Sequence, residues 1–205
     1  MADGNKPFQK RGSNFGKNNS RARMNKHASS SSKALIKEES ELGALLDKTE
    51  VPLILILDCI QDPHNLGACL RTANGAGVDA VIIPRDKAAP VTETAIAISC
   101  GGASHTPIFR VTNLARTMDD LKKRNIWIAG TSDHLGTQDL YEADLTGPLA
   151  LVMGAEAKGM RQLTQNKCDF LISFKMAGFV DCLNVSVATG VCLFEIVRQR
   201  KTKHG

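Results

Sequence analysis

Residues 51–58, VPLILILD, decide the fold, because apolar side chains fill almost every position with no polar alternation. That pattern is typical of a strand buried on both faces of a sheet. Similar runs predict further strands at 78–84, 107–111, 126–131, 148–153 and 169–174. The spacing of apolar residues predicts helices at 33–48, 65–76, 91–101, 113–124, 159–166 and 183–200. Strands that alternate with helices indicate an α/β fold, a parallel sheet flanked by helices.

The N-terminal segment carries all of the excess positive charge. The formal charge of the 205 residues is +5, yet residues 1–37 hold nine Lys or Arg against one Asp, and residues 38–205 carry a net −3. No Val, Ile or Leu precedes Leu35, so this segment cannot bury enough apolar surface to fold alone. We interpret residues 1–40 as a disordered basic arm and linker, and residues 41–205 as one folded domain. We expect six side chains of the arm to contact nucleic-acid phosphates, although a solubilising tail would have the same composition. These are Lys6, Lys10, Arg11, Lys17, Arg21 and Arg23.

Several kinds of protein do not fit the sequence. The longest apolar run, residues 51–57, is far shorter than the roughly 20 residues of a membrane span, so we expect neither membrane insertion nor secretion. The six cysteines occur singly without a C-x-x-C pair, which indicates reduced thiols and a cytoplasmic location. The five histidines lack paired ligand spacing, and we expect no metal. Gly154 and Gly159 have the spacing of a phosphate-binding loop, but Met160 and Arg161 replace its essential Lys and Ser or Thr.

Three polar clusters follow predicted strand ends, where ligands bind in parallel sheets. They are DCIQDPHNLGACLRT at 58–72, VMGAEAKGM at 152–160 and KMAGFVDCLNVSV at 175–187. Their candidate functional residues are Asn65, Arg71, Glu156 and Asn184. Each also has a plain structural interpretation. Asn65 or Asn184 can cap a helix, Arg71 can form a surface ion pair, and Glu156 can be a solvated loop acid.

Taken together, the clusters resemble the three motifs of the SpoU-type (TrmH) 2′-O-ribose RNA methyltransferases of the SPOUT superfamily, in order and spacing. The resemblance covers about residues 51–201 and is greatest to the branch that methylates a guanosine ribose in 23S ribosomal RNA. The stretches NLGACLR, RVTNLARTM, NIWIAGT and NVSVATGVCLFEIVRQR carry it. It implies a SPOUT α/β fold with a C-terminal deep trefoil knot, S-adenosylmethionine as cofactor bound in the knot, and a homodimer. Residues 41–205 would then be the methyltransferase domain.

The resemblance also implies roles for individual residues. The catalytic set would be Arg71, Asn65, Glu156, Asn184 and Cys182, and the cofactor would be bound by Thr131, Gly154, Phe174, Met176 and Leu183. A ribose hydroxyl is a poor nucleophile, so the site must orient its oxygen and take or share its proton. We expect Arg71 at the target nucleotide and its phosphate, oriented by Asn184 and Glu156. Because a guanidinium hardly deprotonates, the identity of the base stays open.

The chain departs from the family pattern at three places. Cys182 stands where the family usually has Ser, and Lys175 replaces a usual Pro. A basic arm occupies the position of the folded RNA-recognition domain that is usual in the ribosomal branch. Two alternatives therefore remain: a guanosine 2′-O-methyltransferase acting on transfer RNA, or an RNA-binding protein of the same fold with weakened catalysis.

Overall fold

A computed structural model describes residues 33–132, 136–155 and 159–203. Within these residues eight strands form one sheet in the order β1-β4-β3-β2-β7-β5-β8-β6, and all neighbouring pairs are parallel. The strands are β1 (Ile36–Lys37), β2 (Leu53–Leu57), β3 (Ala80–Pro84), β4 (Ile108–Val111), β5 (Trp127–Thr131), β6 (Gln138–Asp139), β7 (Leu149–Met153) and β8 (Phe170–Ser173). The predicted parallel sheet is confirmed.

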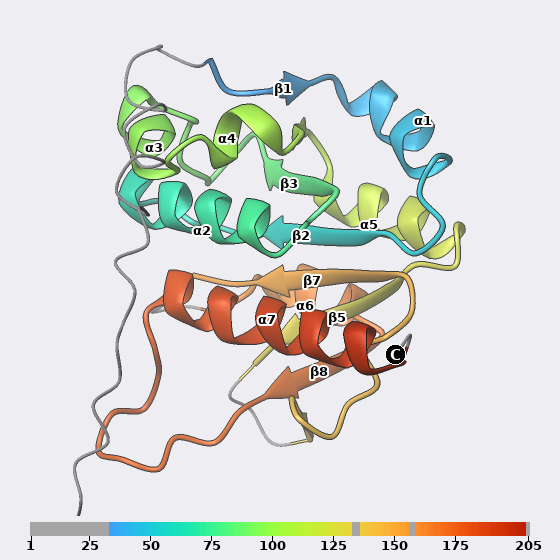
Figure 1. Cartoon of the computed structure of the whole chain (residues 1–205), viewed down its shortest axis with the longest axis vertical. Coiled ribbons are helices and arrows are strands. Elements are labelled where there is room, and N and C mark those ends of the chain that lie inside the picture. The colour runs from blue at the N-terminus through green and yellow to red at the C-terminus, as the bar shows by residue number, and fades with distance from the viewer. Residues whose placement is uncertain (1–32, 133–135, 156–158, 204–205) are drawn as a thin grey trace, which may run out of the picture. The chain divides into compact units, whose positions relative to one another are not determined.

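Helices cover both faces of this sheet. They are η1 (Glu39–Glu41), α1 (Leu42–Leu46), α2 (Pro63–Gly75), α3 (Glu93–Ile98), α4 (Gly102–His105), α5 (Leu114–Lys122), α6 (Gln162–Lys167) and α7 (Val185–Lys203). In Figure 1, α2 and α7 lie side by side across the near face of the sheet, and they pack against each other. Helix α2 also contacts α3 and α4, whereas α5 and α6 contact each other.

The side chains of β2 explain why both faces need a cover. Leu53, Leu55 and Leu57 enter the core that α2 and α7 share, whereas Ile54 and Ile56 enter a second core with α1 and α5. All five side chains are at most 2% exposed. Successive side chains of a strand point to opposite faces, so a continuous apolar run requires helices on both sides. The sequence 51–58 therefore predicts the two-sided architecture correctly.

The segment before β2 differs from the prediction. The helix expected at 33–48 is wrong at its start, because Ile36–Lys37 forms β1 and pairs with β4. The Leu35 N–H donates to the Ala103 carbonyl at 2.7 Å, and the Ile108 N–H donates to the Leu35 carbonyl at 2.8 Å. These backbone bonds favour an extended conformation over the helical one that the apolar spacing allows. Residues 33–40 include β1 and the start of η1. The predicted division of the chain at residue 40 stays a prediction.

Two smaller differences concern a helix and a strand. The helix expected at 91–101 ends at Ile98, and α4 follows after Gly101. Gly101 has φ 94°, a left-handed conformation that interrupts a helix and that glycine adopts easily. The two-residue strand β6, which pairs with β8, was not expected.

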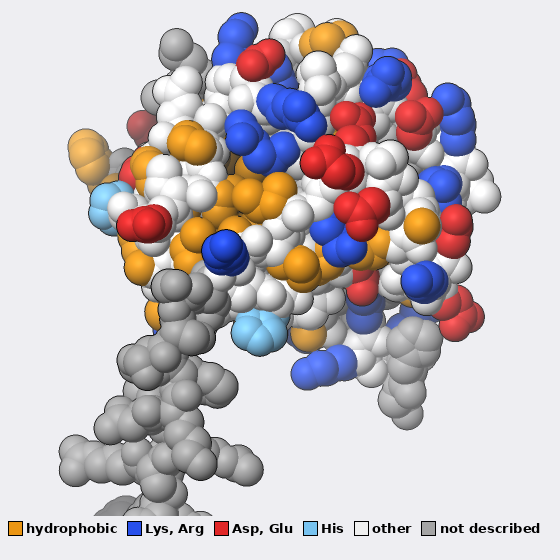
Figure 2. All heavy atoms as spheres, turned by 90° about the horizontal axis from the view of Figure 1, so that it is seen from above, with side chains coloured by type: hydrophobic (Ala, Val, Ile, Leu, Met, Phe, Trp, Pro, Cys, Tyr) orange, Lys and Arg blue, Asp and Glu red, His pale blue; other side chains and the backbone are white. Residues whose placement is uncertain are grey.

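Strand β1 forms one edge of the sheet, and β6 forms the other. Figure 2 looks onto the side of the molecule that carries β1, and hydrophobic side chains gather there beside Lys and Arg side chains. Ile36 on β1 is 50% exposed.

No helix of the described residues is long and apolar enough to cross a membrane. The trefoil knot implied by the resemblance stays a prediction.

Candidate functional site

A cavity of about 320 Å³ opens at the carboxyl ends of β5, β7 and β8, next to the start of α7. Its lining residues are Thr131, Ser132, Met153, Gly154, Ala155, Gly159, Met160, Gln165, Ile172, Ser173, Phe174, Met176, Asp181, Cys182, Leu183, Val185 and Ala188. All five residues predicted to bind a cofactor, namely Thr131, Gly154, Phe174, Met176 and Leu183, are in this set. The structure therefore brings them together at one cavity, at the sheet edge where ligands of parallel sheets bind.

Gly154 makes the closest backbone approach in the cavity wall. A Cβ atom at this position would lie 2.3 Å from the Gly159 carbonyl carbon and from the Met160 nitrogen. The segment folds back here, because the Gly159 N–H donates to the Ala155 carbonyl at 2.7 Å and the Ala155 N–H donates back at 3.1 Å. Only a glycine leaves room for this fold-back, so Gly154 has a steric role in shaping the cavity.

The other walls combine apolar side chains with a few polar groups. Met153, Met160, Phe174 and Leu183 are apolar, and the cavity also contains the Asp181 carboxyl group. The Thr131 hydroxyl donates to the Val152 carbonyl at 3.2 Å, which fixes the side chain at the end of β5. Sites for organic ligands commonly have this composition, with mainly apolar walls and a few placed polar groups.

A pair of asparagines joins the first and third polar clusters. Asn184 Nδ2 donates to Asn65 Oδ1 at 3.0 Å, across 119 residues of sequence. Asn184 Oδ1 also accepts from the Ser186 N–H at 2.9 Å, so this side chain caps the start of α7. Asn184 therefore caps a helix, as one interpretation of the sequence predicted, and it also contacts Asn65. At the start of α2 the cap is Asp62, which accepts from the His64 N–H, and not Asn65.

Arg71 lies two helical turns into α2 and is exposed. It follows Asn65 by six residues, so the two side chains leave the helix about a third of a turn apart. Arg71 is not among the residues that line the cavity. Arg71 therefore lies on the same helix as Asn65, but its side chain is exposed and outside the cavity lining.

The remaining predicted residues fall into two groups. Cys182 lines the cavity and is exposed, and Lys175 is exposed on the same loop. Glu156 and the six basic residues of the arm, Lys6, Lys10, Arg11, Lys17, Arg21 and Arg23, lie outside the described residues. Among the residues that the structure describes, no group of three or more His, Cys, Asp or Glu side chains could hold a metal ion.

An ion pair that was not expected from the sequence lies directly after the lining residue Met160. Asp58 directly follows β2 and is completely buried, and its Oδ1 accepts from Arg161 Nε at 2.8 Å and from the Arg161 terminal nitrogen NH2 at 2.7 Å. Partial burial lowers the pKa of Arg161, but hydrogen bonding to Asp58 and the attraction of the Asp58 charge together outweigh burial and raise this pKa. The only signal in the sequence was an acidic residue at the carboxyl end of a buried strand.

Comparisons with known proteins find a family model and relatives that are similar to this chain. The family model described as "SpoU rRNA Methylase family" matches residues 52–194. A protein of Pectobacterium atrosepticum named "23S rRNA (guanosine-2'-O-)-methyltransferase RlmB" is 61% identical over 163 residues, which cover 80% of this chain and 66% of that protein. A protein of the same name from Pseudomonas putida is 57% identical over 166 residues, with the same coverage. The chain thus matches 66% of the length of these relatives.

Solved structures show the same fold. The crystal structure titled "A. aeolicus TrmH/SpoU tRNA modifying enzyme" is 30% identical, with a TM-score of 0.69, and the match covers 81% of this chain and 85% of that one. The SpoU methyltransferase AviRb from Streptomyces viridochromogenes, solved in complex with the cofactor AdoMet, is 31% identical with a TM-score of 0.70. That match covers 75% of this chain and 60% of the other.

Proposed function

Because this chain belongs to the SpoU rRNA methylase family, we propose that it methylates the ribose 2′-hydroxyl of a guanosine in 23S ribosomal RNA, with S-adenosylmethionine as methyl donor. The observation that carries the proposal is the single cavity lined by all five residues of the expected cofactor set. The bacterial relatives named 23S rRNA (guanosine-2'-O-)-methyltransferase support the substrate. Because such RNA is cytoplasmic in bacteria, we expect the protein there.

The cavity fits S-adenosylmethionine in size and chemistry. Its volume of about 320 Å³ lies at the lower end of the range of small-molecule sites. Phe174, Met176 and Leu183 offer apolar contacts for an adenine ring, and the Asp181 carboxylate can accept hydrogen bonds from polar groups. At Gly154 the missing side chain lets the Gly159–Met160 backbone pack close, which shapes this wall of the cavity.

The polar cluster around Asn65 and Asn184 suits the ribose chemistry. S-adenosylmethionine supplies an activated methyl group, so the protein must hold the ribose oxygen in line with it and accommodate the hydroxyl proton. The bond between the two amides fixes the start of α2 against the start of α7, next to the cavity. Arg71 is exposed on α2, where its forked guanidinium can hold a phosphate of the target RNA. Since Arg stays protonated, its role is electrostatic and orienting.

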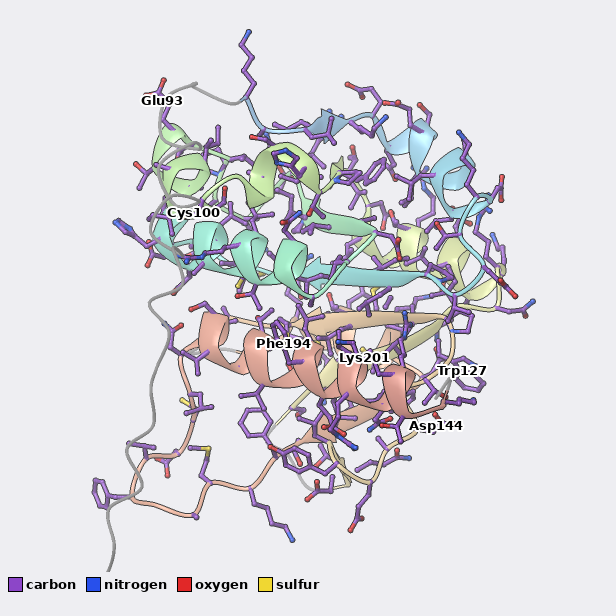
Figure 3. All side chains as sticks on the ribbon, in the orientation of Figure 1. Glu93, Cys100, Trp127, Asp144, Phe194 and Lys201 are labelled. Carbon is purple, nitrogen blue, oxygen red and sulfur yellow. The ribbon has the colours of Figure 1, made fainter. Side chains whose placement is uncertain are left out.

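We also propose that the protein is a homodimer that uses α7. Val187 is 52% exposed and Phe194 is 53% exposed, and they are seven residues apart, so they lie on the same side of the helix. Figure 3 labels Phe194 on α7, together with Lys201 seven residues further along the helix. The apolar stripe therefore consists of Val187 and Phe194. An exposed apolar stripe of this kind is typical of a helix that packs against another protein surface. The substitution Phe194→Arg should give a monomer in light scattering, and a variant that stays dimeric would contradict the proposal.

Methyl transfer to RNA tests the function directly. Purified protein and labelled S-adenosylmethionine are incubated with total RNA that lacks this modification, and ribose-methylated positions are mapped. We expect label at a guanosine of 23S ribosomal RNA. Arg71→Lys should lower the transfer rate, because Lys keeps the charge and loses the fork. The matched control is Arg116→Lys, an exposed residue on α5 that should transfer at the wild-type rate.

Two other outcomes would change the proposal. Label in transfer RNA would keep the reaction and move the target, a candidate favoured by the 30% identity to the TrmH/SpoU tRNA modifying enzyme. No label, together with measurable cofactor binding, would indicate an RNA-binding protein with weakened catalysis. Cys182→Ser then separates the causes, because a large gain in transfer would identify the cysteine as the weakness.

The basic arm provides a separate prediction about RNA affinity. Deleting residues 1–32 removes seven Lys or Arg, so RNA should bind more weakly and with a smaller dependence on salt concentration. Unchanged affinity and salt dependence would indicate a solubilising tail.

A further inference from the structure

Asp58 holds both ends of one segment of the cavity wall. It consists of Gly154, Ala155, Gly159 and Met160, the described residues between the end of β7 and Arg161, and we call it the wall segment. At its beginning, the Asp58 N–H donates to the Met153 carbonyl at 2.8 Å. At its end, the Asp58 carboxylate accepts two hydrogen bonds from the Arg161 side chain and a third from the Arg161 N–H at 3.0 Å. Asp58 therefore contacts the residues on both sides of the wall segment.

The wall segment is in direct contact with the cavity. Gly154, Ala155, Gly159 and Met160 all line it. Arg161 immediately follows Met160, so a displacement of Arg161 would carry the cavity wall with it. The two backbone bonds between Ala155 and Gly159 hold the two parts of the wall segment together, but they do not tie it to the sheet. The tie to the sheet is made by Asp58, on the adjacent strand end.

We propose that Asp58 and Arg161 are positioning residues for the cofactor, which hold the wall segment against the sheet so that the cavity keeps its bound shape. The inference rests on the proposed function only for the identity of the ligand. Asp58 is completely buried, and its three bonds to Arg161 fix the distance and the direction of the contact. A site held in its bound conformation loses less entropy when the ligand binds, which raises affinity.

Helix α6 offers a matched control because a second ion pair ties its other end. Lys167 Nζ donates to both carboxylate oxygens of Asp119 at 2.7 Å. This pair joins α6 to α5 and does not line the cavity. Lys167→Gln therefore removes an anchor of the same helix without touching the wall segment. Arg161→Gln removes the anchor that we propose to matter.

The first experiment measures the equilibrium binding of S-adenosylhomocysteine, the demethylated product, by calorimetry. We expect Arg161→Gln to weaken binding by about 10- to 100-fold, the size found for residues that orient ligands of metal sites. Arg161→Lys, which keeps the charge and one contact, should lie between Arg161→Gln and wild type. Asp58→Asn keeps its backbone bond to Met153 and should also weaken binding. Lys167→Gln should bind within about twofold of wild type, and an equal loss in Lys167→Gln would overturn the inference.

The second experiment needs no ligand and separates this inference from the proposed function. Hydrogen exchange of the Ala155 and Gly159 amides reports whether the two backbone bonds between these residues stay formed. Exchange should be faster in Arg161→Gln than in Lys167→Gln. Equal exchange in the two variants would overturn the positioning role. If wild type does not bind S-adenosylhomocysteine and the difference in exchange persists, the proposed function fails and the role of Asp58 in holding the wall segment stands.

Discussion

Replacing Gly154 by Ala is the sharpest test of the cavity geometry. The added Cβ would lie 2.3 Å from two backbone atoms of the neighbouring Gly159 and Met160, and ordinary contacts begin at 3.4 Å. The backbone must therefore move by about 1 Å, because no side-chain rotation can relieve the clash. Overpacking of this kind costs about 1–3 kcal/mol. If the strain is relieved by opening the cavity wall, S-adenosylhomocysteine binding weakens by about 5- to 150-fold.

Calorimetric titration measures that loss, and Gly178→Ala is its control. Gly178 lies on the loop that carries Met176 and Leu183, and a Cβ atom there meets nothing within 4 Å. Its variant should bind within about twofold of wild type, because an open position carries little strain. If Gly154→Ala bound as tightly as Gly178→Ala, the wall would not be as closely packed as the structure indicates, and the steric role of Gly154 would be wrong.

Three further predictions concern capping, thiol reactivity and pH. Asn184→Ala removes the cap of α7, which is worth about 1 kcal/mol, so the melting temperature should fall by about 2–4 °C in calorimetry, and an unchanged value would contradict the capping role. Burial raises the pKa of the Cys192 thiol to about 12, so an alkylating reagent at about pH 8 should modify the exposed Cys182 and spare Cys192, as mass spectrometry can check. Hydrogen bonds from Arg198 hold the pKa of Glu195 below its usual 4.5, so this stabilisation is present above pH 4.5 and is lost as pH falls through the lower folded value. The stability difference between wild type and Glu195→Gln in urea should therefore shrink in acid, and a difference independent of pH would contradict this.

The sheet could be predicted from the sequence because its strands are local signals. Residues 51–58 specify a strand buried on both sides, and β2 is the result. The segment around Ile36 could not be predicted in the same way, because its apolar spacing fits a helix, whereas its conformation depends on pairing with β4 about 70 residues later. Long-range pairing overrides local propensity there.

The candidate site, like the sheet, could be predicted from the sequence only in part. The five cofactor candidates came from the family resemblance, and they line one cavity because they follow or flank strand ends that meet on one side of the sheet. The bond between Asn65 and Asn184 could be expected only as proximity, since its geometry depends on how α2 packs against α7. The contact between Asp58 and Arg161 could not be expected, because 103 residues separate the partners and the sequence showed only an acidic residue at a strand end.

The order of strands in the sheet has a consequence for synthesis of the chain. β2 finds one neighbour early, since its residues pair with β3 about 26 residues later, but its other neighbour, β7, begins about 95 residues downstream. At the usual translation rate of about 5–20 residues per second, one backbone edge of this very apolar strand waits roughly 5–20 s for its partner. An unpaired edge is a template for pairing with other chains. The chain is therefore most exposed to aggregation after β2 has been synthesised and before β7 has been. This period ends when β7 pairs with β2.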